Sequence, residues 1–151
     1  MRTFAKPTLE LREPRVTVLY DAECPFCRWA IGMLLVWDRR ERLVPVTLQE
    51  PAAESLLGEL TPEQRMETWH FVAATGEHYG GGAAFAPLFE LLPAGQPFAR
   101  LFTRFPAVAG RVYEAVSRHR SRLANVIPRR LQRLADRTLR ERTQLTREPD
   151  R

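Results

Sequence analysis

The two cysteines of this 151-residue chain stand two residues apart, in Cys24-Pro25-Phe26-Cys27. A cysteine attacks a disulfide as its thiolate, so a reactive cysteine needs surroundings that stabilise negative charge. Residues 15–20 have the apolar pattern of a short buried strand, residues 21–25 form a turn, and a helical period begins at Phe26. We therefore expect Cys24 at a helix N-terminus, where unpaired backbone N–H groups and the helix dipole favour an anion.

Cys27 is expected one helical turn after Cys24 on the same face, so that the two sulfurs can form a disulfide. Pro25 suits the first turn of a helix, where its missing N–H is not needed. The chemistry that follows is thiol–disulfide exchange: Cys24 attacks a target disulfide, and Cys27 then displaces the target and leaves a Cys24–Cys27 bridge. The same steps in reverse oxidise a dithiol, and the reduction potential sets the direction.

Three other interpretations of the cysteine pair stay open. The cysteines can be small buried apolar residues, or their spacing can arise by chance. They can also be half of a zinc site, which needs four ligands. The chain has no second cysteine pair, and His70, His78 and His119 lack the spacing of a zinc-binding histidine pair. We therefore expect neither a metal nor another cofactor.

Asp21, just before the cysteine pair, has two interpretations. Its carboxylate can lie near the sulfurs and transfer a proton between the two exchange steps. It can instead cap the turn that enters the helix, a position that Asp favours. A carboxylate close to a thiol also raises the pKa of that thiol and so opposes the helix dipole. Asp21 is the third candidate catalytic residue, after Cys24 and Cys27.

The rest of the first half predicts the elements that position this site. Residues 43–48 contain a second strand, in which Pro45 indicates a sheet edge or an irregular start. Pro51 can open a short helix that Gly58 ends. The helix that begins at Phe26 has six apolar residues on one face, which we expect in the core. They are Phe26, Trp29, Ala30, Met33, Leu34 and Trp37.

The second half of the chain predicts a hairpin followed by helices. Residues 68–74 and 77–79 are strand-like and are joined by a turn at Thr75-Gly76. The glycines at 80–82 are interpreted as the hairpin exit, since no Gly-Lys-Ser/Thr follows them for a phosphate-binding loop. Helices are predicted over residues 83–92, from about 108 to 123, and from Pro128 to about 143. His119 lies on the apolar side of its helix, so we expect it to be at least partly buried.

The predicted element order is β-α-β-α-β-β-α with additional C-terminal helices. Parallel crossovers come first and an antiparallel hairpin comes last, which is the order of a thioredoxin-like α/β fold. We expect a polar N-terminal extension over residues 1–14, a thioredoxin-like domain over residues 15–125, and a basic C-terminal helix and tail over residues 126–151.

At Tyr20-Asp21-Ala22-Glu23-Cys24-Pro25-Phe26-Cys27 the sequence resembles the D-x-x-C-x-x-C signature of the DCC family of thiol–disulfide oxidoreductases. The similarity continues through residues 43–48 and 80–92 and ends near residues 111–120. This resemblance implies a thioredoxin-like fold and redox-active cysteines, and it assigns functional roles to Asp21, Cys24 and Cys27.

Two features depart from the expected pattern. Members of the family usually have glycine where this chain has Ala22, so the turn here cannot require a positive φ. Thioredoxins and glutaredoxins have a cis-proline just before the third strand, facing the cysteines, whereas residues 65–67 of this chain are Arg-Met-Glu. The usual way of placing a substrate strand beside the disulfide is therefore not evident.

The net charge of +5 comes from arginines concentrated after residue 110. In the last predicted helix, arginines surround a leucine stripe, and such a helix can lie on an anionic membrane or dock an acidic partner. It can instead pack its leucines on the domain and leave its arginines in water. These arginines are Arg129, Arg130, Arg133, Arg137, Arg140 and Arg142.

The charge pattern leaves one alternative function, a non-catalytic binding module that uses the basic helices to contact an acidic partner, a membrane surface or nucleic acid. Specific nucleic-acid binding is not expected, because basic tails of this kind are mostly solvated surface. The expected partners are protein or small-molecule thiols and disulfides. Residues 1–14 lack the apolar core of a secretory signal, and the apolar run over residues 29–37 is too short to span a membrane. We therefore expect a cytoplasmic protein.

Overall fold

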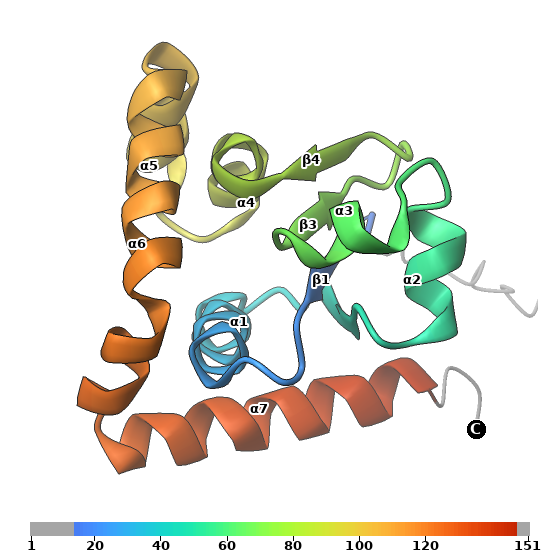
Figure 1. Ribbon diagram of the computed structural model, residues 1–151, viewed down its shortest axis with the longest axis vertical. Coiled ribbons are helices and arrows are strands. Elements are labelled where there is room, and N and C mark those ends of the chain that lie inside the picture. Colours follow the sequence, from blue (N-terminus) through green and yellow to red (C-terminus); the bar gives the residue numbers. More distant parts are fainter. Residues whose placement is uncertain (1–13, 148–151) are drawn as a thin grey trace, which may run out of the picture.

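The computed structural model describes residues 14–147, so nearly all of the expected N-terminal extension lies outside the described residues. Its centre is a four-stranded sheet in the order β2-β1-β3-β4 (Figure 1). β1 and β2 are parallel, and the β1–β3 and β3–β4 pairs are antiparallel. The strands are β1 (Val16–Tyr20), β2 (Leu43–Thr47), β3 (His70–Val72) and β4 (His78–Gly80).

Seven α-helices and one 3₁₀ turn account for most of the remaining described residues. Several of them have a proline in the first turn, where the missing N–H costs no hydrogen bond. They are α1 (Pro25–Trp37), α2 (Pro51–Leu56), α3 (Pro62–Met66), the 3₁₀ turn η1 (Gly81–Ala84), α4 (Phe85–Leu91), α5 (Gln96–Arg104), α6 (Pro106–Val126) and α7 (Arg129–Arg147).

The sheet carries a core on each face, because side chains alternate along β1. Val18 and its neighbours at alternate positions pack with α1 and α4, together with Phe71 of β3. Leu19 points to the other face and packs with Ala53 and Leu57 of α2 and its C-terminal end. The predicted thioredoxin-like α/β fold is thus confirmed, with its β-α-β-α-β-β-α core and additional C-terminal helices.

The two long C-terminal helices enclose α1 (Figure 1), with α6 along one side of the molecule and α7 across its base. α7 and α1 approach closely, since a Cβ on Gly32 would lie 2.5 Å from Cβ of Ala135. Arg142 of α7 is buried and forms an ion pair of 3.1 Å with Asp38, the C-cap of α1. The placement of Arg142 among solvated arginines was therefore wrong, because the carboxylate of Asp38 and two backbone carbonyls bind its guanidinium.

The other predicted helices and strands are present, but some of them begin or end at other residues than predicted. β2 is an edge strand, as Pro45 indicated, and α7 continues to Arg147 rather than ending near residue 143. Helices α3 and α5 were not predicted. His119 is exposed, which corrects the expectation of burial: its Nδ1 lies 2.8 Å from the carbonyl of Ala115 on its own helix.

Candidate active site

Cys24 is the N-cap residue of α1, the helix that begins at Pro25. Its Sγ accepts a hydrogen bond of 3.3 Å from the backbone N–H of Cys27, one of the N–H groups that have no partner within the helix. Both cysteines are reduced and half-buried. A thiolate on Cys24 is therefore stabilised by this N–H and by the positive end of the helix dipole.

The environment of Cys27 is different. Burial, above all, and the hydrogen bond and charge of Cys24 together raise the pKa of the Cys27 thiol to about 12. The guanidinium of Arg120 on α6 lowers the pKa of Cys27, and the carboxylate of Asp21 raises it. The two sulfurs thus differ in kind: Cys24 sits at a helix terminus, and Cys27 is held as a protonated thiol.

Asp21 caps the turn that leads into α1. Its Oδ1 accepts hydrogen bonds from the backbone N–H of Glu23, at 2.9 Å, and from Nε2 of Gln49, at 2.8 Å. Gln49 follows β2, and its Oε1 accepts a bond of 3.2 Å from the N–H of Ala22. These bonds are those of the capping interpretation. The proton-transfer interpretation also keeps support, because Asp21 and Cys27 line the same cavity and interact electrostatically.

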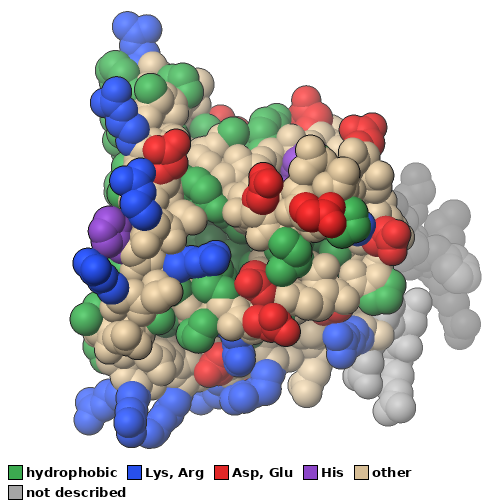
Figure 2. All heavy atoms as spheres, viewed as in Figure 1, with side chains coloured by type: hydrophobic (Ala, Val, Ile, Leu, Met, Phe, Trp, Pro, Cys, Tyr) green, Lys and Arg blue, Asp and Glu red, His purple; other side chains and the backbone are tan. Residues whose placement is uncertain are grey.

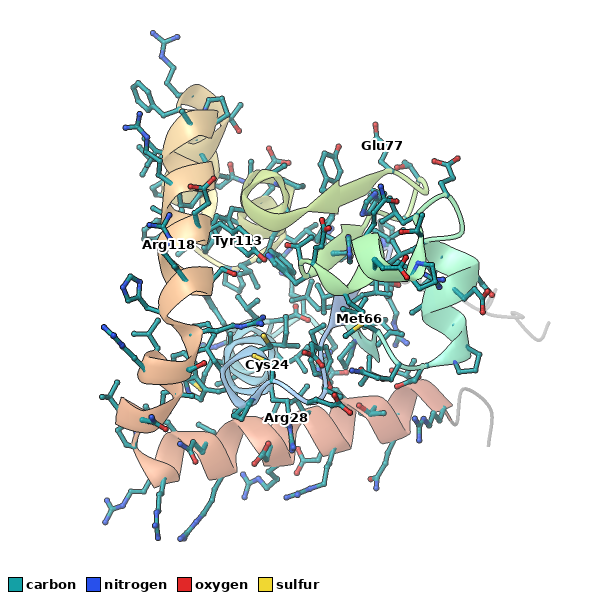
Figure 3. The ribbon with its side chains drawn as sticks, viewed as in Figure 1. Cys24, Arg28, Met66, Glu77, Tyr113 and Arg118 are labelled. Carbon is teal, nitrogen blue, oxygen red and sulfur yellow. The ribbon has the colours of Figure 1, made fainter. Side chains whose placement is uncertain are left out.

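A cavity of about 610 Å³ lies beside Cys27, between α1, the segment before β3 and α6. Figure 2 shows it as a hollow with hydrophobic side chains inside, a basic side chain reaching over it from α6, and acidic side chains on the opposite side. In Figure 3, Met66 and Tyr113 come from different elements to either side of the space beyond Cys24. Asp21, Glu67 and Arg120 are charged residues of its wall.

The apolar stripe of α1 meets the core only in part. All six of its residues, Phe26 to Trp37 at helical spacing, line the cavity and are only half-buried, and two of them, Leu34 and Trp37, also pack against the core. The fully buried residues of α1 are Ile31, Gly32 and Leu35. α1 is therefore apolar on several sides: it packs on the sheet and on α7, and its predicted core face opens into the cavity.

Sequence reasoning missed three contributors to this site. Gln49 and Arg120 come from distant segments, and no local pattern connects either of them with the cysteines. The segment before β3, from Met66 to Trp69, forms a wall of the cavity at the place considered for a cis-proline. All peptide bonds among the described residues are trans.

The arginine-rich helix α7 supports α1 instead of presenting a free apolar face. Ala135 and Leu139 are buried, and Arg28, next to Cys27, forms an ion pair of 2.8 Å with Asp136. The glycines at the hairpin exit are structural, since a Cβ on Gly82 would lie 2.7 Å from the carbonyl oxygen of Ala109 on α6. None of the described helices is long and apolar enough to cross a membrane.

Comparison with known proteins agrees with this geometry. The family model of the DCC1-like thiol-disulfide oxidoreductases matches residues 18–126, a span that contains most of the sheet, the cysteines, the cavity walls and all of α6. No curated protein and no solved structure matches the chain. Because the family model covers well over half of the sequence, the chain belongs to the DCC1-like thiol-disulfide oxidoreductase family.

Proposed function

We propose that the protein exchanges disulfides with Cys24 as the nucleophile and Cys27 as the resolving thiol. The observation that carries this proposal is the position of Cys24 as the N-cap of α1, with the N–H of Cys27 directed at its sulfur. The thiolate of Cys24 attacks a substrate disulfide, one substrate thiolate leaves, and a mixed disulfide forms. Cys27 then attacks Cys24, the second substrate thiolate leaves, and the substrate has gained the two electrons that the protein has lost.

The second step needs a thiolate on Cys27, whose pKa is raised in the reduced protein. When the sulfur of Cys24 enters the mixed disulfide, it no longer carries the charge that raises the pKa of Cys27. Burial still raises that pKa, and the nearby guanidinium of Arg120 still lowers it. We assign Arg120 to this step as a positioning residue and Asp21 as the acceptor of the Cys27 proton. Protein or small-molecule disulfides are the substrates.

The arrangement of α7 gives less support to the alternative, a binding module on the basic helices. A membrane-surface helix needs an uncovered apolar face, whereas Ala135 and Leu139 are buried in contact with the rest of the molecule. Loss of residues 126–151 is therefore expected to act through the stability of α1.

The reduction potential of the Cys24–Cys27 pair tests the proposed function. The protein is equilibrated in glutathione buffers of graded potential, alkylated, and analysed by mass spectrometry for free thiols. We expect one two-electron transition between about −270 and −120 mV, the range of working oxidoreductases. Thiols that never pair in this range, or a bridge that no glutathione buffer opens, would exclude the exchange mechanism. The variant Cys24→Ser is the control: its Cys27 can form only a mixed disulfide with glutathione, which the added mass reveals, and it must show no two-electron transition.

A further inference from the structure

The cavity beside Cys27 is larger and more apolar than exchange of sulfur atoms alone requires. Its volume of about 610 Å³ is within the range of pockets that hold small organic ligands. Aromatic rings come to its wall from several elements, among them Trp29 of α1, Phe85 of α4 and Tyr113 of α6. Such a wall gains free energy when an apolar group displaces its water.

The position of the cavity relates it to the reacting sulfurs. Cys27 is part of its wall, and Cys24 lies one helical turn away at the end of α1. A substrate joined to Cys24 by a mixed disulfide therefore has its neighbouring groups at the mouth of the cavity. A small polar disulfide would leave the aromatic wall uncovered, so its reaction would gain nothing from the cavity.

The apolar surface continues beyond the cavity. Met66, at its edge, has 44% of its surface exposed. The charged wall residues Asp21, Glu67 and Arg120 have both signs, so the mouth does not select for a strongly acidic or basic ligand. An extended chain with one apolar side chain in the cavity and its backbone across the mouth covers both surfaces.

We propose that the cavity binds a large apolar side chain, above all an aromatic one, that stands next to the reacting cysteine of a protein disulfide. This inference rests on the proposed function, because the cavity acts only when Cys24 exchanges with a substrate. The reaction is the two-electron reduction of the protein disulfide described above, in which the cavity supplies binding free energy and takes no part in bond making.

The test uses the reduced full chain and a set of short peptides. Each peptide has one cysteine, linked to a second copy by a disulfide, and differs only in the next residue: Trp, Leu, Ser or Glu. Reactions are stopped with acid, and the peptide thiol released in one turnover is measured by mass spectrometry. We expect the Trp and Leu peptides to react about tenfold faster than the Ser and Glu peptides, as burial of a large apolar side chain allows.

Two variants on one helix assign this preference to the cavity. Val116 lines the cavity, whereas Val112, one turn earlier on α6, is 41% exposed and is not part of the wall. We expect Val116→Asn to reduce the ratio of the Trp to the Ser rate to about 3 or less, and Val112→Asn to leave it unchanged. Ser117→Phe, which narrows the cavity, is expected to act like Val116→Asn, and circular dichroism verifies that each variant is folded.

Bis(2-hydroxyethyl) disulfide, a small polar substrate, separates the two possible failures. If this compound is reduced and the four peptides react at equal rates, the apolar site is wrong and the proposed function stands. If Val112→Asn lowers the ratio as much as Val116→Asn, the preference does not arise in the cavity and the inference is also wrong. If neither the compound nor any peptide is reduced, both proposals fail.

Discussion

At the scale of single residues, the charge of Arg120 is expected to affect the reactivity of Cys27. Its guanidinium lowers the pKa of Cys27, which burial and Cys24 raise. We expect Arg120→Gln to slow the resolving step about three- to tenfold at pH 7, and to do so less at high salt, which screens the charge. Acid-stopped reactions followed by mass spectrometry measure the lifetime of the mixed disulfide.

A matched control for this prediction stands two residues earlier. Arg118 lies on the outer side of α6 in Figure 3, with a side chain 73% exposed and 3.9 Å from Glu114. Arg118→Gln changes the net charge by the same amount and should leave the resolving step unchanged. An equal effect of both variants would show that net charge, and not the position of Arg120, sets the rate.

Asp21 can be tested by the sign of its effect, because its two interpretations predict opposite changes. Its charge raises the pKa of Cys27, and Asn can also cap a turn. If Asp21 only caps the turn, Asp21→Asn lowers the pKa of Cys27 and makes the resolving step faster. We expect this step to become roughly threefold slower or more at pH 7, because the proton acceptor is lost. The dependence of its rate on pH between 6 and 10 measures the difference.

At the scale of elements, the close contact between α1 and α7 leaves no room for a side chain at Gly32. Gly32→Ala would place its Cβ 2.5 Å from that of Ala135, so the helices must separate. We expect a loss of about 1–3 kcal/mol in the free energy of unfolding, typical of overpacked sites. Gly110→Ala in α6 is the matched control: its Cβ meets nothing within 4 Å, so it should stabilise the protein by about 0.5–1 kcal/mol. Urea denaturation measures the free energy of unfolding of both variants. Equal changes in this free energy would contradict the close approach of α1 and α7.

Local patterns predicted the elements that depend on local physics. The position of Cys24 followed from an apolar strand, a turn and a proline in sequence, all of which act within a few residues. α3 was missed although Thr61 and Gln64 form a capping box, because five residues are too few for a helical period. α5 was missed although its apolar residues, such as Phe98 and Leu101, have helical spacing, because nine residues are few for a helical period.

The features of the site that the sequence could not predict all depend on contacts between distant segments of the chain. The stripe of α1 was expected in the core because an apolar face usually packs against the protein, and no periodicity shows that a face borders a cavity. Gln49 and Arg120 reach the site from the turn after β2 and from α6, so only the tertiary fold brings them to Asp21 and Cys27. Arg142 is buried against Asp38, which lies 104 residues away in the sequence. No local pattern could therefore show that this arginine has a partner.

At the scale of the whole molecule, a buried histidine makes stability depend on pH. His70 is 2% exposed, its Nδ1 lies 2.8 Å from Nε2 of His78, and its Nε2 lies 2.9 Å from the carbonyl of Arg65. Burial, above all, lowers the pKa of His70 below its usual 6.5. Below about pH 6.5 the unfolded chain therefore binds a proton that the folded protein does not. The free energy of unfolding then decreases as the pH is lowered.

Denaturation with urea at pH 7.5 and pH 5.5 measures this dependence. We expect the wild type to lose about 1 kcal/mol or less over this interval through His70. His70→Gln should be less stable at pH 7.5 and show a smaller difference between the two pH values. His119→Gln, which changes an exposed imidazole, should keep the wild-type difference. An unchanged difference in His70→Gln would assign the pH dependence to other groups.

The packing of α7 on α1 also has a consequence for synthesis of the protein. α1 and the cysteines leave the ribosome before α7, the helix that covers one side of α1 and follows about a hundred residues later. At a translation rate of about 5–20 residues per second, α1 waits for several seconds or more before Ala135 and Arg142 can reach it. During this interval, Gly32 and Asp38 lack their partners in α7. The nascent chain thus carries its cysteine pair on an incompletely supported helix, and the packing around α1 is complete only when α7 has been made.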